Sequence, residues 1–186
     1  MKYTRFLVPL LLVCLLCFAG IPVAAATTAD VTITATPTYL AMTNSLATWS
    51  IGTVAESQSD AYWWDADGSG YTGAPTDSFD DAECPATITN TGSVAEDFDV
   101  KVADFTGGVG WNIAAAVGAD EVVVKAGKSG DANEAAMVTL TNNDQEFISN
   151  LAAAGTKDWI LHLETGTFGD GVAKEGTLTV TCRAVS

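Results

Sequence analysis

The sequence predicts an all-β protein built as a sandwich of two antiparallel sheets. Apolar and polar residues alternate with a period of two in several short stretches, as they do in strands that bury one face. These stretches recur about every 10–15 residues, and the turns between them are rich in Gly, Asn and Asp. This rhythm is typical of an immunoglobulin-like sandwich, here with about seven to nine strands and one short crossover helix.

The clearest strands occupy residues 83–90 and 96–102. Both alternate apolar and polar side chains, and a turn around Gly92 separates them. We therefore expect a hairpin that forms the central ladder of the sandwich. Its inward residues would be Cys84, Ala86 and Ile88 in the first strand and Phe98, Val100 and Val102 in the second.

Weaker alternation predicts further strands before and after this pair. They are expected at residues 30–36, 46–54, 111–116, 121–125, 136–140, 158–164 and 176–184. The stretch from Asn143 to Gly155 follows a helical spacing instead, with a capping residue at its start and a glycine at its end. The face of this expected helix would carry Phe147, Ile148, Leu151 and Ala152.

Residues 1–26 have the features of a secretory signal peptide. Lys2 and Arg5 precede an apolar run, and three consecutive alanines end at Ala26. A retained membrane anchor is the alternative, although two prolines and a glycine weaken such a helix. We expect cleavage after Ala26 and a secreted, extracellular or cell-surface protein. Its single domain would span residues 27–186, with no stable membrane insertion after cleavage.

The charge of the chain narrows the choice of partners. The 186 residues carry a formal net charge of −15 at pH 7. Such a surface repels nucleic-acid phosphates and anionic lipid head groups, so neither is expected as a partner. Divalent cations are the natural counter-ions of such a chain, and the simpler interpretation is that acidity keeps an exported protein soluble.

Two cysteines remain after the expected cleavage, Cys84 and Cys182. A pair of cysteines in an exported protein is most simply one disulfide. Each shares the phase of the inward-facing residues in its strand, so both thiols would face the core. We expect a Cys84–Cys182 disulfide that ties two strands together.

Residues 55–83 are expected to form an acidic, aromatic loop inserted in the sandwich. This segment holds eight acidic residues and no Lys or Arg. Within it, acidic or hydroxyl side chains stand at the first, third and fifth positions of a pattern with Gly at the sixth, like the front of an EF-hand calcium loop. The possible Ca²⁺ ligands are Asp65, Asp67, Ser69, Tyr71 through its carbonyl, and Asp77. The alternative is an acidic loop whose glycines only make turns.

Three adjacent aromatic residues, Tyr62, Trp63 and Trp64, lie just before this pattern. They could stack on a sugar or contact another subunit, or they could fold back onto the core. The single histidine, His162, lies between two inward leucines and is expected to be an exposed strand residue. Because no nucleophile elbow or metalloprotease spacing accompanies it, we do not expect an enzyme.

The run TITNTGSVAEDFDVKV at residues 87–102 resembles strand pairs of TasA/camelysin-type biofilm filament subunits and other prokaryotic surface proteins. The resemblance implies an Ig-like subunit that is exported and assembled by strand exchange. Residues 27–36 would supply the assembly strand, whose inward residues are Val31, Ile33 and Ala35. That strand could pair within its own sheet or be donated to a neighbouring subunit.

We therefore expect a secreted structural protein, a subunit of an extracellular filament, pilus-like fibre or surface layer. Its partners would be copies of itself or other surface proteins. The alternative is a calcium-assisted carbohydrate-binding or adhesion module, in which residues 62–64 stack on a glycan beside the acidic pattern.

Overall fold

The structure is a computed structural model that describes residues 38–45, 47–64, 71–72, 79–80 and 82–185. Within these residues the secondary structure is almost entirely β, with one short 3-10 turn, η1. No helix in the described ranges is long and apolar enough to span a membrane. The elements are β1 (Met42–Asn44), β2 (Gln58–Trp64), β3 (Tyr71–Thr72), β4 (Ala86–Asn90), β5 (Glu96–Val102), β6 (Asn112–Ile113), β7 (Glu121–Lys128), η1 (Glu134–Ala136), β8 (Val138–Thr139), β9 (Gln145–Leu151), β10 (Thr156–Thr165) and β11 (Leu178–Ala184).

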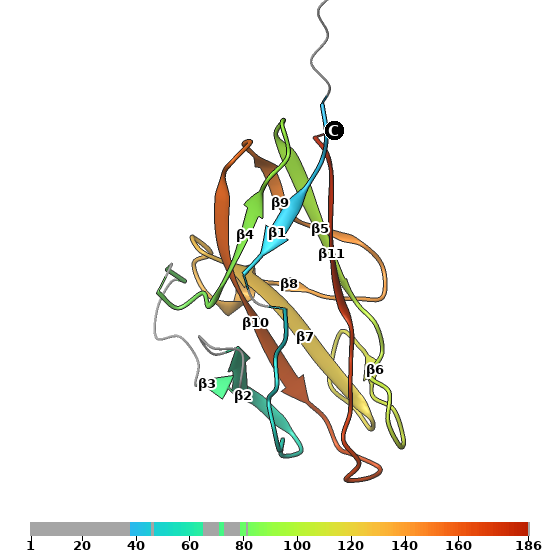
Figure 1. The fold of residues 1–186 in the computed structure, drawn as a ribbon. Helices are drawn as coiled ribbons and strands as arrows, with labels where there is room; N and C mark the ends of the chain where they lie inside the picture. Colours follow the sequence, from blue (N-terminus) through green and yellow to red (C-terminus); the bar gives the residue numbers. More distant parts are fainter. Residues whose placement is uncertain (1–37, 46, 65–70, 73–78, 81, 186) are drawn as a thin grey trace, which may run out of the picture. The chain divides into compact units, whose positions relative to one another are not determined.

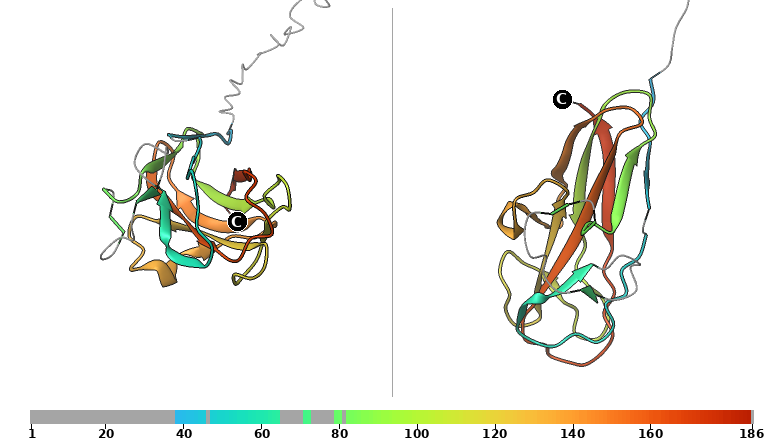
Figure 2. Two further views of the ribbon diagram at one scale, coloured as in Figure 1. Left: turned by 90° about the horizontal axis from the view of Figure 1, so that it is seen from below. Right: turned by 90° about the vertical axis from the view of Figure 1, so that its left-hand side faces the viewer.

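The strands form two sheets, which confirms the predicted all-β sandwich (Figure 1). The larger sheet has eight strands and is organised around β10. One edge of β10 pairs with β4 and then β2, and its other edge pairs with β7. The smaller sheet has three strands in the order β11-β5-β9. Figure 2 shows the two sheets facing one another.

The core lies between the sheets and is rich in aromatic side chains. Trp159 of β10 is fully buried and packs edge-on against Phe147 of β9, with ring centroids 5.7 Å apart. Trp64 of β2 packs on Trp159 from within the larger sheet, at 5.1 Å. The inward residues of β4 and β5 are buried as the alternation predicts. Burial of this apolar surface is the main stabilising contribution to the sandwich.

The predicted hairpin at the centre of the sandwich is wrong, because β4 and β5 belong to different sheets. β4 pairs with β1 and β10, whereas β5 pairs with β11 and β9. The connection between them is an arch that crosses from one sheet to the other. Asn90 holds this arch: its buried side-chain amide donates to the carbonyl oxygens of Val94 and Leu151, and its side-chain oxygen accepts from the Gly92 amide.

Two other predicted elements are also wrong. The helix expected between Asn143 and Gly155 is the strand β9, which pairs with β5 through register shifts. The strand expected at residues 46–54 is absent from the described part of that range, 47–54. The strand lies further along instead, since β2 and β3 fall within residues 55–83, where a loop was expected.

The outer face of the larger sheet is partly covered, which the simple sandwich did not predict. Phe79 packs against Trp63 of β2, with ring centroids 5.8 Å apart. Phe79 and Met137 also crowd Gly127 of β7, where an added Cβ would lie 2.9 Å from the Phe79 ring. A second small layer of side chains therefore lies on the side of this sheet that faces away from β5.

Candidate functional site

The residues expected to bind calcium fall almost entirely outside the described part of the chain. Asp65, Asp67, Ser69 and Asp77 are not described. The backbone of Tyr71 is described and pairs with Trp64 as part of β3. The calcium hypothesis therefore stays a prediction. The same holds for the assembly strand, since Val31, Ile33 and Ala35 also lie outside the described residues.

The expected Cys84–Cys182 disulfide is not formed. Both side chains do turn toward the core, but they lie at different levels of the sandwich. Cys182 is opposite Phe98 in the β11–β5 pair, near the arch. Cys84 precedes β4 and is six residues from Asn90 at the arch, which corresponds to about 20 Å of extended chain. Burial, and then the charge of Glu96, raise the pKa of the Cys182 thiol.

The aromatic run does not form an exposed platform. Tyr62, Trp63 and Trp64 are each at most 3% exposed. The hydroxyl of Tyr62 accepts a hydrogen bond from the Ala55 amide, and Trp64 packs on Trp49 and Trp159 in the core. Because both faces of β2 are covered here, these side chains cannot stack on a glycan in this arrangement. The expected binding site at these three residues is therefore corrected to a structural role.

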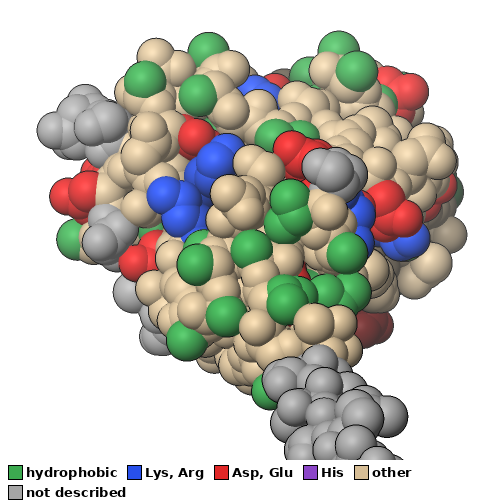
Figure 3. Space-filling model, turned by 90° about the horizontal axis from the view of Figure 1, so that it is seen from above, with side chains coloured by type: hydrophobic (Ala, Val, Ile, Leu, Met, Phe, Trp, Pro, Cys, Tyr) green, Lys and Arg blue, Asp and Glu red, His purple; other side chains and the backbone are tan. Residues whose placement is uncertain are grey.

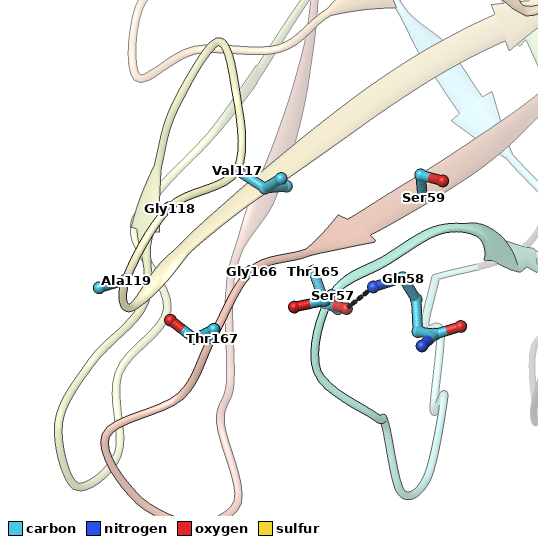
Figure 4. Close-up of a pocket in the computed structure, with 9 residues that line it drawn as sticks. All are labelled: Ser57, Gln58, Ser59, Val117, Gly118, Ala119, Thr165, Gly166 and Thr167. Atoms are coloured by element: carbon cyan, nitrogen blue, oxygen red, sulfur yellow. Dashed lines mark hydrogen bonds between the residues drawn. The ribbon is translucent and has the colours of Figure 1, made fainter.

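A groove of about 320 Å³ lies at one end of the larger sheet (Figure 4). Its walls come from the start of β2, the end of β10 and the loop before β7, through Ser57, Gln58, Ser59, Val117, Gly118, Ala119, Thr165, Gly166 and Thr167. None of these nine side chains is an acid, a base or a thiol. The Thr165 hydroxyl is already engaged, since it donates to the Ala55 carbonyl and accepts from the Gln58 amide. The groove is therefore lined by neutral residues, of which Ser57, Ser59, Thr165 and Thr167 carry hydroxyls.

The smaller sheet has an open edge at β11. Among the described residues, β11 pairs with β5 alone, through an unbroken register from Leu178 to Ala184. Its inward side chains Leu178, Val180 and Cys182 are only half-buried. An edge of this kind is a template onto which a further strand can add.

A cluster of ionisable side chains gathers on the outer face of the larger sheet, around His162. His162 of β10 lies between Trp63 of β2 and Lys125 of β7 in a row across three strands. Glu164 follows on the same face of β10, and Glu134 reaches in from η1. Asn133 caps η1 by accepting a hydrogen bond from the Ala135 amide, which fixes the turn that carries Glu134.

His162 faces outward as the strand phase predicts, but it is fully buried rather than exposed. Its ring stacks on the Trp63 indole with centroids 4.1 Å apart. Nδ1 lies 3.4 Å from Glu134 Oε1. Among the described residues, neither ring nitrogen of His162 has a hydrogen-bond partner.

Lys125 links the two carboxylates of the cluster. Its Nζ donates to Glu134 Oε1 at 2.5 Å and also contacts Glu164 Oε1. Partial burial lowers the pKa of Lys125, but the hydrogen bonds and charges of the two glutamates outweigh it and raise that pKa overall. The ammonium is therefore held in its charged form between two carboxylates.

The imidazole of His162 is held neutral. Burial has the largest effect on the pKa of His162 and lowers it. The negative charge of Glu134 raises this pKa, the positive charge of Lys125 lowers it, and the charges of Glu164 and Asp60 raise it. The net shift is downward from 6.5, so the ring is uncharged near pH 7. A neutral imidazole between two carboxylates offers one nitrogen and two oxygens as possible ligands.

The sequence gives little warning of this cluster. Its members come from separate elements of the fold. The periodicity of apolar residues does not predict the turn η1, which carries Glu134. The sequence does indicate the direction of His162. Because His162 lies between the inward-facing Leu161 and Leu163, it faces outward, and it would be buried if the outer face of the sheet were covered. Nothing in the local sequence reveals that Trp63 stacks on this ring and that Phe79 packs on Trp63.

Comparisons with protein-family models, curated proteins and solved structures give no match to this chain.

Proposed function

We propose that this chain is a secreted structural protein, the subunit of an extracellular filament, pilus-like fibre or surface layer. In this proposal, copies assemble when residues 27–36 of one subunit add as a strand to the β11 edge of the next. The observation that carries the proposal is the open, regular and partly apolar edge of β11. The resemblance of residues 87–102 to filament subunits points the same way.

The β11 edge lacks the features that usually protect an edge strand. Bulges, prolines and unpaired charges discourage strand addition. β11 has none of these in its seven residues, and its only charged side chain, Arg183, is engaged with Asp97, Asp99 and Glu146. The opposite edge of the sheet, β9, is interrupted by register shifts and by a positive φ of 53° at Asn150. Addition is therefore favoured at β11.

The side chains beneath β11 also lack full cover. Phe98 and Val100 of β5 are fully buried, whereas their cross-strand neighbours Cys182 and Val180 on β11 are half-buried. An added strand with inward apolar residues would cover them. Residues 31–35 alternate in this way, with Val31, Ile33 and Ala35 in one phase.

The direction of the chain favours a strand from a neighbour over the chain's own strand. β11 ends where β5 begins, because Ala184 pairs with Glu96. The described chain starts at the same end, since the Ala41 amide donates to Glu96 Oε1 at 2.9 Å (Figure 1). If a strand of residues 31–35 paired with β11 of its own chain, it would run toward this end and would therefore be parallel to β11. A strand donated by a neighbour can run antiparallel to β11. Antiparallel pairing is slightly more stable per residue than parallel pairing. It is also the arrangement of every described strand pair except β6–β7.

The end of the sandwich where β11 stops also exposes apolar side chains, as Figure 3 shows. Tyr39, Leu40 and Val185 are 57%, 43% and 44% exposed. Large exposed apolar side chains are common singly, but here they flank the edge at which assembly is proposed. The expected signal peptide, which would export the chain, completes the proposal.

Deleting residues 27–36 tests assembly. We expect the purified protein to form fibres or sheets in the electron microscope and the deletion variant to stay monomeric in size-exclusion chromatography. If the deletion variant assembles as well as the intact protein, strand donation is wrong.

A peptide experiment separates the donor strand from the rest of the subunit. A synthetic peptide of residues 27–36 should bind the deletion variant and raise its melting temperature. The matched control is the same peptide with Val31→Asp and Ile33→Asp, which should not bind. Equal effects of both peptides would contradict pairing through the apolar face.

A further inference from the structure

His162 presents an arrangement that its protein neighbours do not account for. A buried polar group without a hydrogen-bond partner destabilises the folded state, and such groups are rare in folded proteins. His162 is 0% exposed, and among the described residues both of its ring nitrogens lack a partner. The ring stacks on Trp63, and its Nδ1 lies near a carboxylate oxygen of Glu134.

The atoms around this ring have the spacing of a metal site. Three potential ligand atoms lie within 4.8 Å of one another, one each from Glu134, His162 and Glu164. The separation of 3.4 Å between His162 Nδ1 and Glu134 Oε1 is close to that between two ligands of a tetrahedral ion, about 3.3 Å for bonds of about 2.0 Å. A carboxylate oxygen of Glu164 lies within 4.8 Å of the same atoms and so completes a set of three potential ligands.

The charges also favour a cation at this point. Glu134 and Glu164 bring two negative charges, and Lys125 returns only one. The Lys125 ammonium thus marks where positive charge is stabilised. It is also a competitor, because a metal ion bound to the same oxygens would displace it.

We propose that Glu134, His162 and Glu164 bind one divalent transition-metal ion of the Zn²⁺ class. The imidazole nitrogen favours such an ion over Ca²⁺, which prefers oxygen ligands alone. The site is therefore distinct from the calcium pattern at residues 65–77. Because Glu134 belongs to η1 and the other two ligands to β10, the ion would fasten the covering layer to the larger sheet.

Lys125 gives the proposal its sharpest test. In Zn²⁺ titrations by calorimetry, we expect the protein to bind one equivalent. Lys125→Met removes the competing ammonium but keeps an apolar stem, so it should lower the Kd for Zn²⁺. A purely structural ion-pair cluster predicts no such gain.

Two ligand variants and one control complete the test. We expect the Kd for Zn²⁺ to rise at least about tenfold in Glu134→Gln and also in His162→Gln. Glu134 lies at a partly exposed turn, so Glu134→Gln should still fold. Glu175→Gln, an exposed acid outside the cluster, should leave it unchanged. Co²⁺, which occupies Zn²⁺ sites and absorbs visible light when bound, gives a second readout on the same variants. Absence of one-equivalent Zn²⁺ binding in both the protein and Lys125→Met would overturn the proposal, as would binding that survives both ligand substitutions.

Discussion

The imidazole of His162 and the indole of Trp63 stack with ring centroids 4.1 Å apart and ring planes inclined by 8°. The pair lies on the face of the larger sheet that points away from β5, where a sandwich usually meets water. Both side chains are nevertheless buried: Phe79 packs on Trp63, and Glu134 of η1 lies against His162. The sheet therefore has apolar packing on both faces around β2 and β10.

Truncating Trp63 should show how much this second layer contributes. We expect Trp63→Ala to lower the free energy of unfolding by about 3–5 kcal/mol, as for other large aromatic residues removed from a core. Trp63→Phe keeps a ring against His162 and should cost clearly less. Both values come from urea or guanidinium unfolding followed by circular dichroism. A loss below about 1 kcal/mol for Trp63→Ala would mean that the outer layer adds little to stability.

The covered outer face explains why sequence periodicity missed β2. Tyr62, Trp63 and Trp64 are consecutive and all buried, so the strand shows no alternation of apolar and polar residues. The same cover explains why His162 is buried and not exposed, although it faces outward as its phase in the strand predicts. Periodicity reports which face a side chain takes, but not what lies against that face.

The helical spacing of apolar residues in β9 has a related cause. Phe147 and Ile148 are adjacent and both buried, which a regular strand with one covered face does not allow. The pairing with β5 shifts register at this point, so one residue is inserted as at a β-bulge. The apolar positions then fall at intervals of three and four, which imitates a helix.

The arch at Asn90 could not be predicted from alternation. The phases of β4 and β5 were predicted correctly, because each strand buries one face. Alternation does not specify whether two consecutive strands pair with each other or with strands in facing sheets. Here the buried Asn90 amide bridges to Leu151, far along the chain, and this contact is invisible in the local sequence.

Gly92 is required where the arch turns. A Cβ at this position would overlap Glu96 Oε1 and lie 2.7 Å from the Tyr39 carbonyl oxygen. We expect Gly92→Ala to lower the free energy of unfolding by about 1–3 kcal/mol or more. Gly171→Ala is the matched control, since nothing lies within 4 Å of the methyl group it adds. Equal stability of the two variants would show that the arch can open without cost.

Asp170 should make the stability of the protein depend on pH at the acidic end. Hydrogen bonds from Lys174, then from the Val109 and Val172 amides, lower the pKa of Asp170 to about 2. Because the folded state favours the charged carboxylate, its contribution is complete above the ordinary pKa near 3.8 and is lost as the pH falls through about 2.

Asp170→Asn should therefore melt at a lower temperature than the unaltered protein at pH 6. That difference should shrink as the pH is lowered from about 4 to about 2. Melting temperatures across this range, followed by circular dichroism, provide the measurement. A difference that stays constant with pH would contradict a role for the charged carboxylate.

The acidic pattern at residues 65–77 predicts calcium binding independently of the His162 cluster. Calorimetric titration with Ca²⁺ should give binding that Asp65→Ala combined with Asp67→Ala removes. His162→Gln should not affect it, which distinguishes this site from the proposed transition-metal site. No heat of Ca²⁺ binding in the unaltered protein would rule the calcium hypothesis out.

The proposed assembly is tested most directly by a disulfide between the donated strand and β11. Cys182 lies on the inward side of β11, so a cysteine at one of the inward donor positions should come next to it. Val31→Cys, Ile33→Cys and Ala35→Cys, each combined with Cys84→Ala, cover the possible registers. For each variant, subunits labelled with ¹⁵N and unlabelled subunits are mixed before assembly and then oxidised.

Mass spectrometry of the digested disulfides gives the result. Strand donation predicts that peptides linking the donor position to Cys182 include pairs with one labelled and one unlabelled member. Links confined to a single isotopic label would mean that the strand pairs within its own chain. The absence of any link at all three positions would contradict addition at β11.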